Sequence, residues 1–235
     1  MAGQAVELEL SVPSSLESIE LWQYQKYMGV VDANKDAQGA EEFLNMKLVE
    51  IFCGVSLKDV SAIDLSDFTR ITEILRKAFS SKTPLIRHFE LDGIEFGFVP
   101  NLDKITIGEY IDIEANIGDW KTMHRAMGVL YRPITEKRDD KYLVEKYEGK
   151  TEYAEVLKYM PLNVALGASV FFYHLGKDLS NHILKSLEKE MSTTQTTLHQ
   201  QDLEGSGVGI NRFIDSLEEK QQKLIRQLES LSTQQ

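Results

Sequence analysis

Apolar residues recur at intervals of three and four along residues 102–134, the most regularly patterned stretch of the chain. Such spacing is typical of helices that bury one stripe of side chains. Asp119 is a candidate N-cap for the second of two such helices. Pro133 is expected to end that helix, because proline cannot donate the next backbone hydrogen bond. The two apolar runs are Ile107, Tyr110, Ile111 and Ile113, and then Trp120, Met123, Met127 and Leu130.

The N-terminal third of the chain shows the same helical spacing after a short alternating segment. Residues 6–12 alternate between apolar and polar side chains and predict an opening strand. A helix is expected to begin at Ser18 or Glu20, and further helices are expected at about 41–52 and 66–79. This part of the chain is therefore predicted to be mainly helical.

A different pattern begins after the third of these helices. Residues 85–99 alternate around Asp92-Gly93, which is a strong signal for a two-residue β-hairpin turn. A further strand is predicted at 142–147, and a long helical region at about 151–191, interrupted or kinked at Pro161. The most apolar part of that region is shorter than the roughly 20 residues that span a bilayer, so it is interpreted as a core helix.

These patterns together predict an α+β fold that is predominantly helical, with one β-hairpin and short strands packed with a multi-helix core. Residues 1–191 are expected to form this domain. Residues 192–209 are polar, with three glycines near their end, and are interpreted as a flexible linker. Residues 210–235 are expected to form a C-terminal amphipathic helical tail.

The tail carries a heptad stripe, and its members are the candidate interaction residues of the chain. So short an isolated helix is only marginally stable in water, so it should pack against something. The sequence leaves three partners open: its own domain, a second copy of the chain, or another protein. The stripe consists of Ile214, Leu217, Leu224, Leu228 and Leu231.

The net charge of −11 argues against general nucleic-acid binding, which relies on lysine and arginine to neutralise phosphates. It suits a soluble cytoplasmic protein or one with a basic partner. Cys53 is the single cysteine, so no internal disulfide is expected, and its apolar neighbours indicate a structural thiol. The first ten residues lack the basic and apolar regions of a secretory signal, so we expect no secretion.

No pattern in the sequence predicts catalysis, a metal centre or a bound cofactor. His174 and His182 are two helical turns apart, and His124 has no carboxylate or nucleophile beside it in the sequence. Asp112 and Glu114 are two positions apart, so on a helix they point away from each other. We therefore predict no catalytic, cofactor-binding or metal-binding residues, and the protein is expected not to be an enzyme.

Four segments carry a resemblance to a known class of proteins. The chain resembles proteins of the structural module of tailed-bacteriophage genomes, and it looks similar to tail assembly chaperones or to tail and baseplate accessory proteins. The segments are SLESIELWQYQKY at 15–27, ITIGEYID at 105–112, AMGVLYRPI at 126–134 and MPLNVALGA at 160–168.

The resemblance implies a non-catalytic phage morphogenesis protein, a tail assembly chaperone that binds tape-measure and/or tail-tube proteins. The alternative is a virion structural component, such as an adaptor, baseplate or internal particle protein. The implied partners are tape-measure, tail-tube or baseplate proteins, with self-association as an option and without nucleic acid or membrane. The implied location is the host cytoplasm during assembly, or the virion for the alternative. The family has no active site whose residues could be transferred to this chain.

Overall fold

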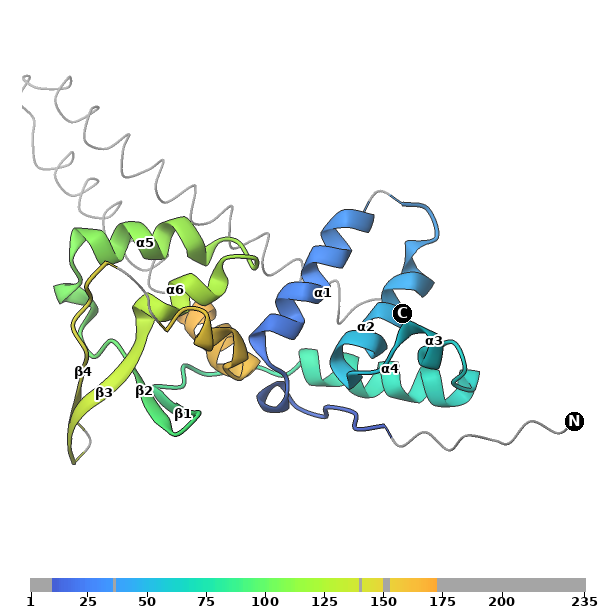
Figure 1. The fold of residues 1–235 in the computed structure, drawn as a ribbon, viewed down its shortest axis with the longest axis horizontal. Coiled ribbons are helices and arrows are strands. Elements are labelled where there is room, and N and C mark those ends of the chain that lie inside the picture. The colour runs from blue at the N-terminus through green and yellow to red at the C-terminus, as the bar shows by residue number, and fades with distance from the viewer. Residues whose placement is uncertain (1–9, 36, 140, 150–152, 173–235) are drawn as a thin grey trace, which may run out of the picture.

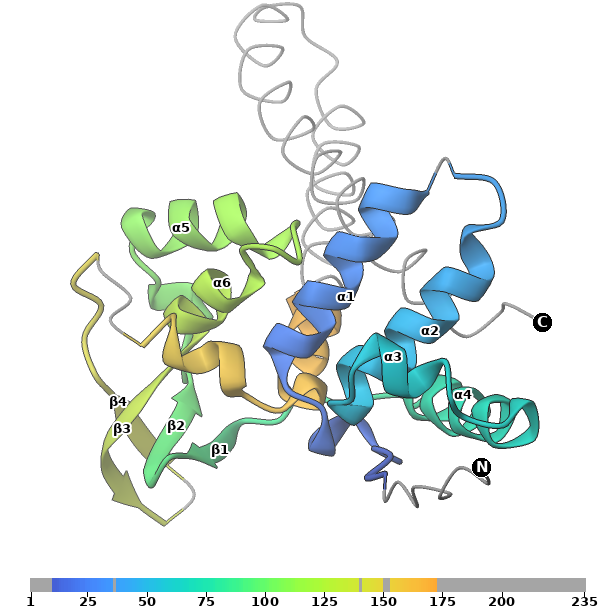
Figure 2. The ribbon, with the colours of Figure 1, turned by 45° about the vertical axis from the view of Figure 1, so that its right-hand side comes forward.

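The computed structural model describes residues 10–35, 37–139, 141–149 and 153–172, and all structural statements refer to these residues. The predicted fold class is confirmed, because the chain is α+β, predominantly helical, and contains one four-stranded antiparallel sheet. Helices α1 to α4, within residues 21–79, gather on one side of the molecule, and the sheet lies with helices α5 and α6, within residues 107–130, on the other side (Figure 1). Figures 1 and 2 both show helix α1 at the boundary between these two groups.

The first group contains the helices predicted at about 41–52 and 66–79, each within a residue of its expected bounds, and a short helix that was not predicted. The predicted strand at 6–12 is wrong for its described part, because residues 10–12 have no regular secondary structure. A strand needs a neighbour for its backbone hydrogen bonds, and none of the described strands pairs with this segment. The elements are η1 (Leu16–Ser18), α1 (Leu21–Asn34), α2 (Ala40–Cys53), α3 (Leu57–Val60) and α4 (Leu65–Phe79).

The predicted hairpin around Asp92-Gly93 is confirmed. It is formed by β1 (His88–Leu91) and β2 (Ile94–Phe98), which pair antiparallel. The turn residues both have positive φ, 51° at Asp92 and 77° at Gly93, as two-residue hairpin turns of the type I′ family require. Aspartate tolerates this conformation and glycine adopts it without strain, which is why the dipeptide was informative.

The prediction that Pro133 ends a helix is wrong, because Pro133 lies inside strand β3 (Tyr131–Arg138). Helix α6 (Met123–Leu130) has already ended at Leu130, and the backbone of Tyr131 is extended, with φ −118° and ψ 122°. Pro133 lies opposite Phe96 of β2, and β3 continues the sheet toward β4 (Lys141–Val144). Proline favours extended geometry at the residue before it, and here that preference supports a strand.

Helix α5 (Ile107–Ile117) precedes α6, and a turn joins the two helices. The N-cap position of α6 is Thr122, so the expectation of Asp119 as the N-cap is wrong. Asp119 Oδ1 accepts a hydrogen bond of 2.9 Å from the backbone amide of Lys121, so it caps the preceding turn. A 3-10 turn, η2 (Leu102–Lys104), lies before α5.

A long helix with an interruption at Pro161 was predicted for about 151–191. The described part of this region has a 3-10 turn, η3 (Val156–Tyr159), before Pro161 and a helix at residues 162–172 after it. Pro161 separates the two and forms an isolated β-bridge with Glu20. Two backbone hydrogen bonds flank the bridge, from Leu21 N to Met160 O at 3.0 Å and from Leu162 N to Ile19 O at 2.8 Å. The entry to α1 is therefore fixed to the entry of the last described helix.

One hydrophobic core spans both groups of elements. Tyr24 of α1 lies edge-on against Trp120, with ring centroids 4.6 Å apart, and it also contacts Phe79 of α4 at 5.8 Å. Such aromatic pairs add to the stabilisation by area burial. Phe68 and Phe171 are only partly buried against this core, whereas its fully buried members include Ile71, Trp120, Met127, Leu130, Val164 and Leu166.

Candidate functional site

Helix α5 exposes most of the apolar side chains that were expected to lie in the core. Ile107 is 79% exposed, Ile111 is 55% exposed and Tyr110 is 36% exposed, whereas Ile113 is buried. The prediction of one buried stripe through these four residues is therefore wrong. Residues at i, i+3 and i+4 lie on one side of a helix, so Ile107, Tyr110 and Ile111 form a continuous apolar surface, here called the α5 face.

A buried charge determines which side of α5 faces the core. Glu109 is 5% exposed and lies one turn before Ile113 and two turns before Ile117, both of which are buried. Its Oε1 atom forms an ion pair of 2.9 Å with Nη2 of Arg132, which is 8% exposed. A buried charge is tolerated only when it is paired, so this contact fixes the rotation of the helix and turns the α5 face outward.

The second carboxylate oxygen of Glu109 completes the start of the helix. Thr106 donates to Glu109 Oε2 from its backbone amide at 2.7 Å and from its hydroxyl at 2.8 Å. The Thr106 hydroxyl oxygen accepts a hydrogen bond from the Glu109 amide at 3.2 Å, which makes a capping box. The Thr-x-x-Glu spacing is a sequence signal for the capping box. No spacing indicates the ion pair with Arg132, because Arg132 comes from a different element.

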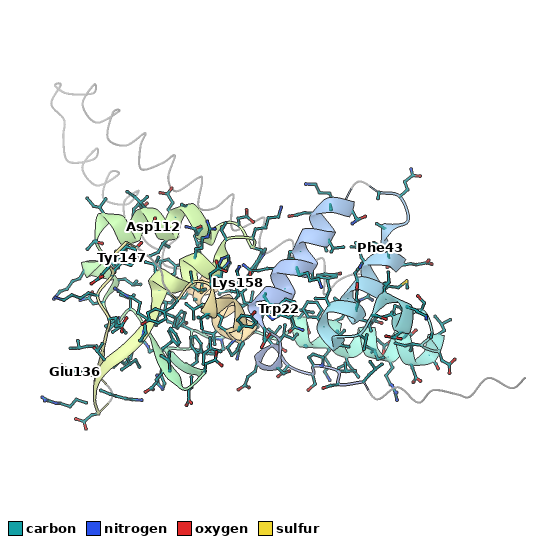
Figure 3. All side chains as sticks on the ribbon, viewed as in Figure 1. Trp22, Phe43, Asp112, Glu136, Tyr147 and Lys158 are labelled. Carbon is teal, nitrogen blue, oxygen red and sulfur yellow. The ribbon has the colours of Figure 1, made fainter. Side chains whose placement is uncertain are left out.

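Beside this ion pair, the hydroxyl of Tyr147 donates a hydrogen bond to the carboxylate of Asp112 (Figure 3). Burial and this hydrogen bond raise the pKa of Tyr147 to about 12. Asp112 is thus engaged with a tyrosine rather than with another acidic group. Within the part of the chain that the structure describes, no group of three or more histidine, cysteine, aspartate or glutamate side chains is placed to hold a metal ion.

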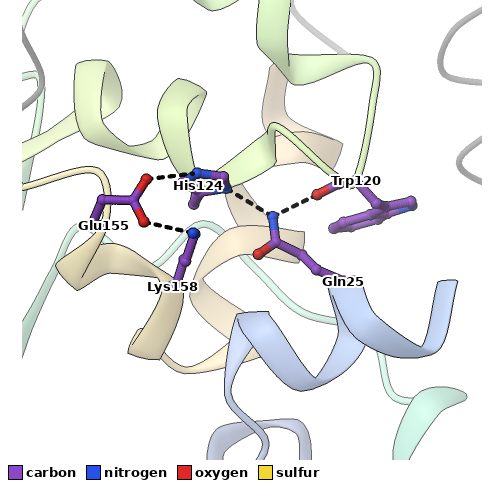
Figure 4. A network of polar contacts seen from close by, with 5 residues as sticks. All are labelled: Gln25, Trp120, His124, Glu155 and Lys158. Carbon is purple, nitrogen blue, oxygen red and sulfur yellow. Dashed lines mark hydrogen bonds and ion pairs between the residues drawn. The ribbon is translucent and has the colours of Figure 1, made fainter. Parts of the chain in front are cut away.

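A polar network joins α1 to α6 and η3 (Figure 4). The side-chain amide of Gln25 donates to Trp120 O at 2.5 Å and lies 3.0 Å from Nδ1 of His124. On the other side of the ring, His124 Nε2 is 3.6 Å from Oε1 of Glu155, and Lys158 Nζ is 2.5 Å from Oε2 of the same carboxylate. The structure therefore brings to His124 a carboxylate that its sequence neighbours did not provide.

The contacts of Gln25 define the protonation of the imidazole. A backbone carbonyl only accepts hydrogen bonds, so the Gln25 atom that faces Trp120 O must be the amide nitrogen. The same nitrogen faces Nδ1 of His124, which must then be the acceptor. The neutral ring consequently carries its proton on Nε2, directed toward Glu155.

The environment of His124 favours this neutral form. Burial lowers the pKa of His124, and the nearby Lys158 lowers it further, while Glu155 acts in the opposite direction. The Nδ1 lone pair of the neutral ring accepts from Gln25 and the Nε2 proton points toward Glu155, so the ring has no lone pair open to an incoming substrate. This arrangement positions three elements against each other, and no sequence spacing could have revealed it.

The other candidate residues from the sequence are placed as follows. Cys53 is half-buried at the end of α2, and burial raises the pKa of its thiol to about 11, so the thiol stays protonated near neutral pH. His174, His182 and the three glycines of the linker lie outside the described residues. So do the candidate interaction residues Ile214, Leu217, Leu224, Leu228 and Leu231.

Comparisons of the chain with models of known protein families, with characterised proteins and with solved structures return no significant match. No helix within the described residues combines the length and apolar character needed to cross a bilayer.

Proposed function

We propose that this protein is a non-catalytic morphogenesis factor of a tailed bacteriophage, a tail assembly chaperone that binds tape-measure and/or tail-tube proteins. The observation that carries the proposal is the exposure of Ile107 and Ile111 on the α5 face, on a helix otherwise fixed in the fold. The resemblance of four chain segments to phage structural proteins provides the biological setting.

The size of the α5 face suits weak and reversible binding. Fully covering two isoleucine side chains contributes about 3–6 kcal/mol, at about 1.5–3 kcal/mol each. Part of this is offset by the translational and rotational freedom that the partners lose. One such contact gives modest affinity, whereas several copies of the protein along one long apolar client bind firmly together. A chaperone that tube subunits must later displace needs this combination.

The rest of the described structure is consistent with this role. The Glu109–Arg132 ion pair and the capping box hold α5 in one orientation, so the α5 face is presented without a folding cost on binding. The net charge of −11 helps to keep a complex with an apolar client in solution. The His124 network supports a positioning role, since both ring nitrogens already face protein groups.

The proposal is tested by co-expression with the tape-measure protein encoded in the same genome. Wild-type protein should keep the tape-measure protein soluble and co-purify with it. With the variant Ile107→Ser/Ile111→Ser, several-fold less tape-measure protein should be soluble and co-purify. The matched control is Leu65→Ser/Leu143→Ser, which removes two exposed leucines from other elements and should behave like wild type. Equal recovery with all three proteins, or no recovery with wild type, would overturn the proposal.

A second measurement separates the chaperone from the virion component. A chaperone is displaced before the tail is complete, so mass spectrometry of purified particles should find it absent or far below the stoichiometry of tail proteins. Stoichiometric recovery in particles would instead support an adaptor, baseplate or internal protein that uses the same face for a permanent contact.

A further inference from the structure

A groove on the far side of the molecule from α5 has features that the proposed function does not use. It lies between the N-terminal segment and the α3–α4 region, and its volume is about 420 Å³. Figure 1 shows the N-terminal segment passing these helices. Its apolar lining comes from Leu10, Val12, Ile63 and Ile71, of which Ile71 is buried and the others are partly buried. This volume falls within the range of roughly 300–1,000 Å³ that is usual for ligand clefts.

Negative charge borders this apolar lining. Among the described residues, Asp59, Asp64 and Asp67 line the groove together with one cation, Arg70. Arg70 forms an ion pair of 2.9 Å with Asp67 and so compensates one of the three carboxylates. The N-terminus of α4 contributes about half a positive unit charge, which leaves the groove clearly negative. The carboxylates that remain uncompensated beside the apolar lining repel anionic ligands and attract cationic ones.

We propose that this groove binds a short segment of a partner protein in which an apolar side chain is flanked by lysine or arginine. The apolar side chain would lie against Ile63 and Ile71, and the cations would pair with Asp59 and Asp64. The carboxylates argue against a phosphate-bearing or acidic ligand. This surface is separate from the α5 face, so one chain could hold two segments at once, and the inference does not depend on the proposed function.

The test uses the full-length protein and fluorescent peptides, with binding followed by anisotropy. The probe is a short peptide that repeats leucine and lysine. One comparison peptide has serine in place of each leucine, and another has glutamate in place of each lysine. The leucine–lysine peptide should bind several-fold more tightly than the serine–lysine peptide, and the leucine–glutamate peptide should not bind. Equal binding of the first two would overturn the proposal, because the apolar lining would then have no role.

Variants assign the binding to the groove. Asp59→Asn/Asp64→Asn should weaken binding of the leucine–lysine peptide about three- to tenfold, the effect expected for two exposed ion pairs. Asparagine is also a good N-cap, so α4 should remain folded, as a thermal melt can check. The control Glu73→Gln/Glu90→Gln removes two exposed carboxylates that do not line the groove and should bind like wild type. The proposal would be contradicted if the aspartate variant and the glutamate control weakened binding of the leucine–lysine peptide equally. It would also be contradicted if only Ile107→Ser/Ile111→Ser weakened that binding.

Discussion

Gln25 of α1 and His124 of α6 are 99 positions apart in the sequence, and their side chains lie 3.0 Å apart, amide nitrogen to Nδ1. This contact crosses the boundary between the N-terminal helices and the half of the molecule that contains the sheet (Figure 4). Because the same amide nitrogen also donates to Trp120 O, it must face His124 as a donor. Only the neutral ring, with Nδ1 unprotonated, can accept this contact. The stability of the protein should therefore respond to mild acid.

The first prediction is that protonation of His124 destabilises the fold as the pH falls below about 6.5. The pKa of His124 is lowered in the folded chain and returns to about 6.5 on unfolding. Between these two values the unfolded state binds more protons, so stability is fully present above about pH 6.5 and falls as the pH falls through the folded pKa. The slope contributed by one proton is at most about 1.4 kcal/mol per pH unit.

The measurement is the free energy of unfolding in urea for wild type and His124→Asn at pH values on both sides of about 6.5. The variant should have a flatter dependence whatever its absolute stability. The hydrogen bond from Lys158 keeps the pKa of the nearby Glu155 below its usual value, so this carboxylate does not change its charge in this range. Parallel curves for the two proteins would show that His124 is not the group that titrates.

The second prediction concerns the buried ion pair that orients α5. Glu109→Gln keeps the size of the side chain but leaves Arg132 charged and unpaired, so it should destabilise the protein by about 3–5 kcal/mol. The double variant Glu109→Leu/Arg132→Met removes both charges and should recover a large part of that loss. Urea titration of the three proteins tests this. A loss below about 1 kcal/mol for the single variant would mean that water reaches the pair.

The third prediction compares two glycines in helices. A Cβ atom at Gly167 would lie 2.2 Å from the backbone oxygen of Pro84, whereas one at Gly29 would meet nothing within 4 Å. Gly167→Ala should therefore force backbone shifts and destabilise the protein by about 1–3 kcal/mol or more. Gly29→Ala should stabilise it by about 0.5–1 kcal/mol, because alanine is the better helix former. Thermal melts that shift in the same direction for both variants would contradict the close approach of Pro84.

The fourth prediction concerns the C-terminal tail, which lies outside the described residues. Deleting residues 195–235 should leave the unfolding midpoint of the domain nearly unchanged and should weaken self-association or partner capture, because the heptad stripe is expected to act as a detachable contact. The substitution Leu224→Ser/Leu228→Ser should weaken the same association in the full chain. Destabilisation of the domain by several kcal/mol on deletion would instead make the tail part of the core, since each fully covered side chain contributes roughly 1.5–3 kcal/mol.

The sequence predicted correctly the elements that depend on residues close together in the chain. The intervals of three and four located α2, α4 and α6, and Asp92-Gly93 located the hairpin, because a turn depends on the φ angles of its own two residues. The apolar side of α5 was predicted wrongly, because counting apolar positions could not show that Glu109 would be buried against Arg132.

The remaining errors have the same origin in contacts between distant segments. Strand β3 was missed because Pro133 has no backbone N–H and was interpreted only as the end of a helix. In the sheet, Pro133 lies opposite Phe96 of β2, which is 37 positions earlier in the chain. The surroundings of His124 were missed because Gln25 and Glu155 come from other elements. Side chains of this kind have no characteristic spacing, and only the packed fold brings them together.

The bridge between Glu20 and Pro161 has a consequence for the order of events during synthesis. The amide of Leu21 is bonded to Met160 O, so the start of α1 reaches its final partner only after the segment around Met160 has left the ribosome. Contacts between such distant segments close a long loop and form late and slowly. Until then the start of α1 lacks this partner on the nascent chain, so its apolar side chains there are open to other proteins.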